Sequence, residues 1–168
     1  GQLDIVEAVN QAGAGSQTLT LSGLTQSGTS AVTFSAATTA PNATKNMINV
    51  SGQSGAGTGQ DLPGGVIIGP WATTGTTGIV QTDYAVYDAS GYVLPANIAA
   101  SDQSTWTSST DAYTSSNAAV ALSDDRTMAA LRNTGATATI TLSDGIAGYK
   151  LATNGILNAV NSTLTIAP

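Results

Sequence analysis

The chain has 168 residues and a formal net charge of −6, and only 8% of its residues are charged, against roughly 25% in ordinary soluble domains. Four basic residues that form no cluster argue against a nucleic-acid partner. The absence of cysteine and histidine excludes disulfides, thiolate metal sites and histidine-based catalytic triads. Apolar runs stay far below the roughly 20 residues that span a membrane, and the length fits one domain, residues 1–168, or a segment of a larger repeat protein.

Aliphatic residues alternate with threonine or serine along much of the chain. The amino-terminal stretch 3–9 fits a short helix or a strand, and local propensity does not decide between them. Five later stretches have a period of two, which predicts strands with aliphatic residues inward and threonines outward. Glycine-rich or serine-rich turns separate these stretches. They are residues 18–22, 31–35, 46–50, 137–142 and 162–166.

The segment 64–91 concentrates aromatic side chains in a chain that is only 5% aromatic. It contains Trp71, Tyr84 and Tyr87, and Trp106 follows later. Aromatic rings among polar residues suit stacking on sugars, but they also suit packing at the corner of a light core. We favour the packing role and keep the glycan contact as an alternative for these four residues.

Residues 123–135 carry helix signals: a serine or aspartate cap, early acidic residues, a late arginine and a glycine at the end. The same stretch contains the sequence TMAALRNTG, which leads into a threonine-rich strand. Local chemistry therefore predicts a helix here, and a strand over residues 128–132 is the competing prediction.

The runs GGVIIGPWATT and DYAVYDASGYV resemble the repeats of the autotransporter-associated β-strand proteins, which are very large extracellular bacterial β-helix proteins. Residues 65–69, 71–73 and 83–85 occupy the places of the glycine-aliphatic run, the Trp-Ala-Thr core and the Asp-aromatic-Ala strand. Pro70 departs from the glycine that is usual there, and the insertion 75–81 is longer than in the family. The resemblance covers about residues 16–166. It implies passenger or stalk material without catalysis, and a strand rather than a helix over 128–132.

The strand pattern admits two all-β architectures. In a single-stranded parallel β-helix (β-solenoid), small side chains such as alanine, glycine and threonine fill a narrow bore. An antiparallel β-sandwich filament subunit would use more large aliphatic and aromatic residues in its core. We favour the β-solenoid, with irregular rungs because no strict period is visible, and keep the sandwich as the alternative.

The sequence contains few residues that could carry out catalysis. Glu7 is the single glutamate, so a carboxylate pair for glycoside hydrolysis would come from aspartates. The adjacent Asp124 and Asp125 suit a turn or a cap beside Arg126 better than acid-base work. The nonapeptide signature of calcium-loaded solenoids is missing. We therefore expect no catalytic residue, no metal and no cofactor.

These observations predict a non-catalytic structural protein of an extracellular bacterial fibre, stalk, sheath or filament on the cell surface. Its expected partners are copies of itself, joined end to end or edge to edge through β-strands. Two alternatives remain open. One is a glycan-binding or adhesin domain that uses exposed aromatics, and the other is a strand-exchanging, pilus-like subunit that donates residues 3–9 or 162–166.

Overall fold

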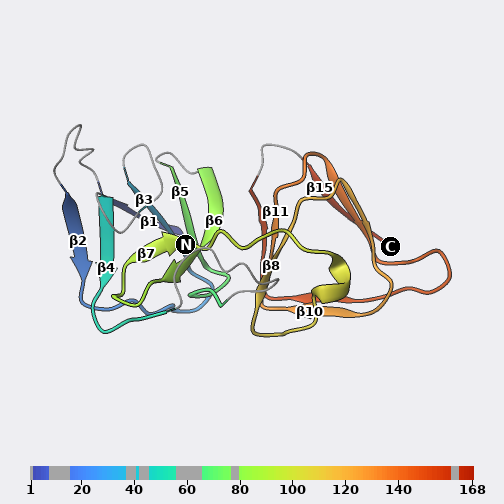
Figure 1. Cartoon of the computed structure of the whole chain (residues 1–168), viewed down its shortest axis with the longest axis horizontal. Helices are drawn as coiled ribbons and strands as arrows, with labels where there is room; N and C mark the ends of the chain where they lie inside the picture. Colours follow the sequence, from blue (N-terminus) through green and yellow to red (C-terminus); the bar gives the residue numbers. More distant parts are fainter. Residues whose placement is uncertain are drawn as a thin grey trace. The chain divides into compact units, whose positions relative to one another are not determined.

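The computed structural model describes residues 2–7, 16–36, 41, 46–55, 66–76, 80–159 and 163–168. Its regular structure in these residues consists of strands β1 to β15 and one short 3₁₀-helix, η1 (Gln103–Thr105) (Figure 1). The expected all-β fold is therefore confirmed. The chain divides into two compact units, of which unit 1 comprises Gly1–Gly59 and Ile67–Asn97, and unit 2 comprises Gln60–Val66 and Ile98–Pro168.

Unit 1 contains seven strands in two sheets. The larger sheet has the order β1-β3-β5-β6-β7, and the smaller one pairs β2 with β4. The strands are β1 (Gln2–Glu7), β2 (Gln17–Leu21), β3 (Ala31–Ala36), β4 (Asn46–Val50), β5 (Ala72–Thr76), β6 (Val80–Tyr87) and β7 (Val93–Pro95).

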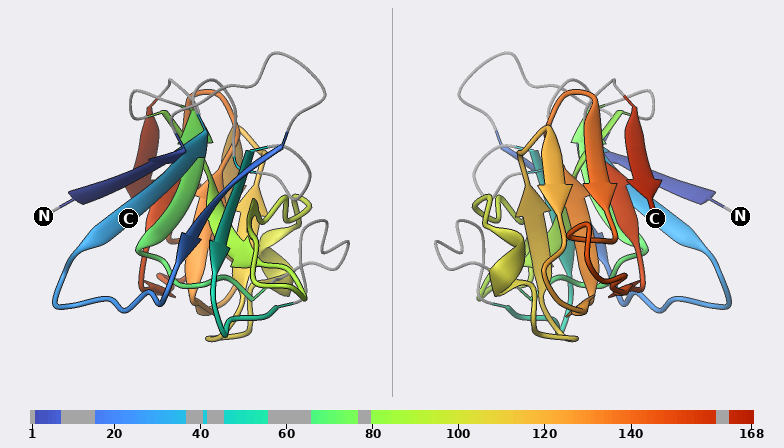
Figure 2. Two further views of the ribbon diagram at one scale, coloured as in Figure 1. Left: turned by 90° about the vertical axis from the view of Figure 1, so that its left-hand side faces the viewer. Right: turned by 90° about the vertical axis from the view of Figure 1, so that its right-hand side faces the viewer.

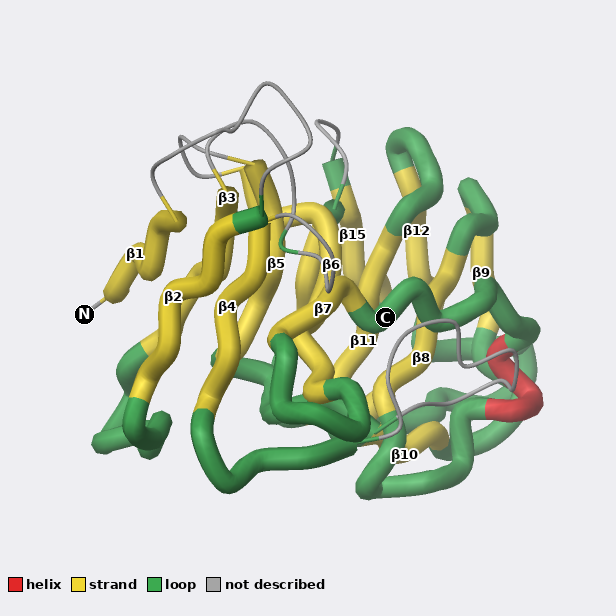
Figure 3. The backbone as a smooth tube through the Cα atoms, turned by 60° about the vertical axis from the view of Figure 1, so that its left-hand side comes forward, coloured by secondary structure: helices red, strands yellow, loops and turns green. Residues whose placement is uncertain are grey.

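Parallel pairing in register builds the first part of unit 1. Strands β1, β3 and β5 run parallel, so that Leu3 pairs with Val32 and Val32 with Ala72 (Figure 2, left). Strand β2 likewise runs parallel to β4 (Figure 3). The direction then reverses, because β6 is antiparallel to both β5 and β7. Unit 1 is thus a parallel stack followed by an antiparallel hairpin.

The core of unit 1 is formed by aliphatic and aromatic side chains from both sheets. The period-two pattern places them on the same face of successive strands. Ile5, Leu19, Leu21, Trp71 and Tyr87 pack against this core from the periphery. Its buried members are Val32, Phe34, Ile48, Val50, Ala72, Ala85 and Val93.

A tight turn between β6 and β7 joins the antiparallel part of unit 1 to β4. The amide of Val50 donates to the carbonyl of Gly91 at 2.9 Å, and Nδ2 of Asn49 donates to the carbonyl of Ser90 at 2.8 Å. Gly91 has a φ of 83°, and a Cβ there would also press on the carbonyl oxygens of Val50 and Gln53. Glycine is therefore required by both conformation and space.

Unit 2 contains eight strands in three parallel sheets. The sheet orders are β10-β13, β14-β11-β8 and β15-β12-β9. The strands are β8 (Ala112–Ser115), β9 (Ala119–Ala121), β10 (Arg126–Met128), β11 (Ala130–Asn133), β12 (Ala138–Thr141), β13 (Leu151–Thr153), β14 (Ile156–Asn158) and β15 (Leu164–Ala167).

The strands of unit 2 recur in the same order. The succession β10, β11, β12 is followed by β13, β14, β15, and each strand of the second set pairs in parallel with its counterpart in the first. Asn133 and Asn158 hydrogen-bond at a separation of 25 positions, as do Asp125 and Lys150. Strands β9, β12 and β15 lie side by side with a common direction (Figure 2, right).

The core of unit 2 lies between these three sheets. Leu142, Tyr149, Leu151 and Leu164 pack around it. Its buried members are Trp106, Tyr113, Val120, Leu122, Met128, Leu131 and Ile140.

The strands predicted from alternation are found: the bounds of 46–50 agree and those of the others differ by one or two residues, with residue 162 outside the described residues. The helix signals of 123–135 are overridden, because β10 and β11 take up this stretch and pair with β13, β8 and β14. The stretch 3–9 is strand β1 as far as Glu7, and residues 8 and 9 lie outside the described residues. One expected inward residue differs: Ile166 is exposed, because β15 is the last strand of its sheet.

Candidate functional site

The four aromatic residues singled out in the sequence do not form one site. Tyr84 in β6 is buried, and Trp71 and Tyr87 are partly buried against the core of unit 1. Trp106 belongs to unit 2, where its side chain is 0% exposed and its indole N–H donates to Oγ of Ser101 at 3.3 Å. Burial raises the pKa of the Tyr87 hydroxyl. Tyr84 and Trp106 therefore present no ring face on which a sugar could stack.

The geometry of the turn explains why glycine stands first in the sequence Gly69-Pro70-Trp71. The carbonyl of Trp71 accepts from the amide of Val32 at 2.8 Å, and the amide of Ala72 donates to the carbonyl of Gly69 at 3.1 Å, so the turn is held on β3. A Cβ at Gly69 would overlap Nε1 and Cδ1 of the Trp71 indole. Glycine at this position lets the indole fold back over its own turn and onto the core.

Asp83 is the first residue of the motif Asp-Tyr-Ala, and its carboxylate is buried. Its Oδ1 accepts from the amide of Tyr84 at 2.8 Å, and its Oδ2 accepts from the amide of Asn97 at 3.0 Å. Both oxygens thus accept hydrogen bonds from backbone amides, which stabilise the buried carboxylate. The carboxylate fixes the segment after β7 to β6 and is a structural group.

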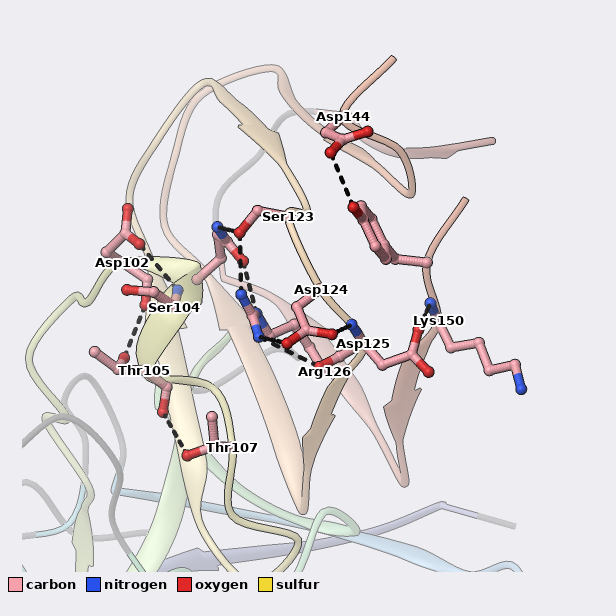
Figure 4. Close-up of polar contacts among 12 residues, drawn as sticks. Asp102, Ser104, Thr105, Thr107, Ser123, Asp124, Asp125, Arg126, Asp144 and Lys150 are labelled. Carbon is pink, nitrogen blue, oxygen red and sulfur yellow. Dashed lines mark hydrogen bonds and ion pairs between the residues drawn. The ribbon is translucent and has the colours of Figure 1, made fainter. Parts of the chain in front are cut away.

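A polar cluster around Arg126 joins η1 to β10 (Figure 4). The buried guanidinium donates from Nε to Oε1 of Gln103 at 2.6 Å and from Nη2 to Oγ of Ser123 at 3.2 Å. Its ion pair with the exposed carboxylate of Asp124 is longer, at 3.8 Å. Oδ1 of Asp125 accepts from the amide of Lys150 at 2.8 Å. The Asp124-Asp125 pair therefore serves a turn, as expected.

A second polar loop precedes β13. The Asp144 carboxylate accepts from the amides of Ile146 and Ala147 and, at 2.9 Å, from the hydroxyl of Tyr149 (Figure 4). The amide bonds, together with the hydroxyl bond, lower the pKa of Asp144. The same hydrogen bond to Asp144 raises the pKa of Tyr149. The Asp144 carboxylate therefore accepts its hydrogen bonds from donors within its own loop.

Ionisable groups are otherwise scattered. Within the residues that the structure describes, no three acidic side chains come together in a way that could hold a metal ion. The described part of the chain also contains no helix long and apolar enough to cross a membrane. Sequence reasoning had not singled out the structural roles of Asp83 and Arg126. The signal available for Asp83 was its place in the Asp-Tyr-Ala motif.

In each unit the apolar core is buried at one end of the strand stack and partly exposed at the other end. This difference between the ends is the feature most relevant to function. In unit 1 the inward-facing ladder runs from Leu3, which is 56% exposed, to Val32 and Ala72, which are buried. The hairpin of β6 and β7 contributes Ala85 and Val93 to the core beyond Ala72. The core is covered there, whereas at β1 no further strand of the described residues covers it.

Unit 2 has the opposite order along its chain. The ladder Tyr113, Leu131, Ile156 begins with two buried residues and ends with a side chain that is 44% exposed. The ladder Val120, Ile140, Ile166 ends in the same way, at 40%. Trp106 is a buried member of the same core.

Backbone bonds also close the first end of unit 2. The amide of Ser101 donates to the carbonyl of Thr114 at 2.9 Å, and Ala100 forms a parallel bridge to the same residue. We call the edge of β1 and β2 the β1 end, and the edge of β13, β14 and β15 the β15 end. Among the described residues, no further strand pairs with the outer side of β1, β14 or β15.

Comparisons with protein-family models, with curated proteins and with solved structures find no match to this chain.

Proposed function

We propose that this chain is a non-catalytic structural segment of an extracellular bacterial surface fibre, stalk, sheath or filament. It is built as an irregular parallel β-solenoid and associates with copies of itself through β-strand stacking. The observation that carries the proposal is the recurrence in unit 2, where β13, β14 and β15 repeat β10, β11 and β12 in parallel and in register. Repetition of this kind is how solenoids extend along one axis.

Side-chain ladders support the solenoid architecture. Nδ2 of the Asn133 side chain donates to Oδ1 of the Asn158 side chain at 2.8 Å, so that like residues stack on neighbouring strands. Thr33 and Thr73 pair in the same way in unit 1, with their hydroxyls 3.2 Å apart. Such ladders satisfy polar groups between strands without large apolar side chains, which accords with a chain that is 5% aromatic.

The surface composition supports a static assembly. With 8% charged residues, copies of the chain repel one another weakly, and the threonine-rich outer faces suit exposed strands. The motif resemblance of residues 65–91 to extracellular β-helix repeats supports a location outside the cell. The engagement of Asp83 and Asp144 by protein donors favours structural roles for these carboxylates over acid-base catalysis.

The pilus-like alternative is less well supported. Its two candidate donor segments, β1 and β15, pair in parallel with β3 and β12 of the same chain. A donated strand would instead leave its place in its own chain and pair with a strand of a neighbouring subunit. The glycan-binding alternative keeps only the partly exposed rings of Trp71 and Tyr87, which lie against a core.

Electron microscopy and sedimentation of the purified 168-residue chain over a wide concentration range test the proposal. We expect filaments or end-to-end oligomers whose share rises with concentration. Dispersed monomers at the highest attainable concentration would contradict it. Binding of a glycan array that is lost in Trp71→Ala, with the fold retained, would favour the adhesin alternative instead.

A further inference from the structure

The corner between β13 and β14 is the one place in the sequence where glycine follows asparagine. Asn154 is exposed there, and Gly155 is partly buried. Asparagine is among the chemically less durable residues of proteins, because the backbone nitrogen of the next residue lies near its side-chain Cγ. A glycine in that next place has no Cβ to obstruct the approach of the nitrogen. Among the asparagines of the sequence, Asn154 therefore meets the least steric resistance to this reaction.

The hydrogen bonds of the corner leave the reacting nitrogen loosely held. The amide of Asn154 donates to the carbonyl of Ala129 at 3.2 Å, and the carbonyl of Gly155 accepts from the amide of Leu131 at 3.0 Å. The amide of Gly155, by contrast, donates to Oγ1 of Thr153 at 3.4 Å. That distance exceeds the roughly 2.7–3.2 Å of an ordinary N–H···O bond. With so weak an acceptor, this nitrogen can turn towards the Asn154 side chain.

The preceding rung of unit 2 has alanine at both places of the same corner. Strands β13 and β14 pair with β10 and β11 at a separation of 25 positions. Ala129 and Ala130 therefore stand where Asn154 and Gly155 stand one rung later. Gly155 also does not have the positive φ that Gly145 has. Alanine variants at either position of the later corner are thus expected to fold.

We propose that Asn154 is a site of spontaneous deamidation in the folded protein, with the backbone nitrogen of Gly155 as the attacking atom. The nitrogen gives its proton to water and bonds to Cγ of Asn154. The bond from Cγ to Nδ2 breaks, and ammonia leaves, which closes a five-membered succinimide. Water then opens the ring at either carbonyl carbon and leaves aspartate or isoaspartate. Nothing is oxidised or reduced, and water is the one co-reactant. This inference is independent of the proposed function.

The isoaspartate product would alter the pairing of the second rung with the first. Its main chain runs through the side-chain carbon, so an additional methylene group precedes Gly155. The bond from the Leu131 amide to the Gly155 carbonyl and the bond between Asn133 and Asn158 both lie beyond this insertion. Both depend on the register of β14 with β11. The modification is therefore expected to loosen β14 and to add one negative charge at an exposed corner.

Asp144 and Gly145 form the second pair in unit 2 that could close a succinimide, here with loss of water. The Asp144 carboxylate accepts hydrogen bonds from the amides of Ile146 and Ala147 and from the hydroxyl of Tyr149. These bonds lower the pKa of Asp144 and keep its carboxylate ionised. An ionised carboxylate resists attack at its carbon, because the hydroxide equivalent is a poor leaving group. We therefore expect Asp144 to remain unchanged while Asn154 reacts.

Incubation of the native chain in mildly alkaline buffer, made with water enriched in the heavy oxygen isotope, tests the proposal. Peptide mass spectrometry should find the heavy label at Asn154, with isoaspartate and aspartate forms separated by chromatography. Asn117 is the matched internal control, because it is exposed but is followed by alanine. The variant Gly155→Ala should slow the reaction roughly tenfold or more. The thermal midpoint of the native chain should fall with incubation time, and that of Asn154→Ala should stay constant.

Three results would overturn the proposal. The first is an intact Asn154 in the folded chain under conditions in which the same chain reacts when unfolded in guanidinium, since the corner would then protect the pair. The second is aspartate without isoaspartate, which would indicate direct hydrolysis of the side chain. The third is a folded Gly155→Ala that reacts at the native rate. If Gly155→Ala does not fold, the isoaspartate content of the native chain decides instead.

Discussion

The side-chain amide of Asn133 donates a 2.8 Å hydrogen bond to the side-chain oxygen of Asn158, which lies 25 positions later on the neighbouring parallel strand. The same amide donates to the carbonyl of Gly135 at 3.1 Å, and its oxygen accepts from the amide of Gly135 at 3.1 Å. Asn133 therefore links two successive strands and also shapes the turn that leads from β11 to β12. A buried side chain with this many partners is difficult to replace.

Replacement of Asn133 by aspartate is expected to destabilise unit 2 by about 2–4 kcal/mol, because the carboxylate loses both donated hydrogen bonds and faces two acceptor oxygens. Denaturant unfolding monitored by circular dichroism measures this loss. Asn117→Asp is the matched control, since Asn117 is exposed between β8 and β9. Equal stability of the two variants would show that the asparagine ladder contributes nothing.

Gly69→Ala is expected to destabilise unit 1 by about 1–3 kcal/mol, because the new methyl group overlaps the Trp71 indole and displaces it from the core. The tryptophan emission should shift to longer wavelength as Trp71 enters water. Gly23→Ala is the matched control, because a Cβ at Gly23 meets no atom within 4 Å. An unchanged spectrum and unchanged stability in Gly69→Ala would mean that Trp71 is not seated as described.

Arg126→Lys is expected to loosen η1 from β10, with a loss of about 1.5–3 kcal/mol in unfolding free energy. A lysine ammonium cannot reproduce the guanidinium fork that reaches both Gln103 and Ser123. Acrylamide quenching of the adjacent Trp106 should rise in a background that carries Trp71→Phe. Lys150→Arg serves as control. If quenching and stability stay at native levels in Arg126→Lys, the cluster does not hold η1.

The Asp144–Tyr149 hydrogen bond predicts a window of pH for the stability of its loop. The pKa of Asp144 is lowered below its ordinary value of about 3.9. The ionised carboxylate therefore contributes to folding stability above about pH 4, and this contribution is lost as pH falls through the lowered pKa. The pKa of Tyr149 is raised above its ordinary value of about 10. The protonated hydroxyl therefore contributes to folding stability below about pH 10, and this contribution is lost as pH rises further.

Thermal unfolding of the native chain and of Tyr149→Phe from pH 2 to pH 11 tests this window. The midpoint difference between the two is expected to be largest between roughly pH 5 and pH 9 and to shrink on both sides. A difference that stays constant across the range would mean that the hydrogen bond does not depend on the ionisation of either residue.

The sequence was sufficient for the strands that alternate, because period two is set by the pleat of the chain itself. Strands such as β7, β10 and β13 have three residues each, which is too short for a period to be recognised. The stretch 123–135 was ambiguous because local helix signals compete with pairing to three distant strands, and pairing prevails. The exposed Ile166 could not be anticipated, since whether a further strand covers it is decided outside its own segment.

For the aromatic residues, too, the sequence indicates the general role, whereas tertiary pairing decides the position. Composition favours packing over glycan contact for the four aromatic residues, and in the structure Tyr84 and Trp106 are buried while Trp71 and Tyr87 are partly buried. That Trp106 is fully buried in unit 2 while Leu3 of β1 is 56% exposed in unit 1 depends on tertiary pairing. The open ends are therefore a property of the fold that no single motif encodes.

X-ray fibre diffraction from aligned, assembled protein tests most directly whether this chain extends by stacking parallel strands. Strands of successive copies that continue the ladders would lie across the fibre and give a strong reflection at about 4.7–4.8 Å along the fibre axis. Fibres without that axial reflection, or with the strand spacing perpendicular to the axis, would contradict assembly through β-strand stacking.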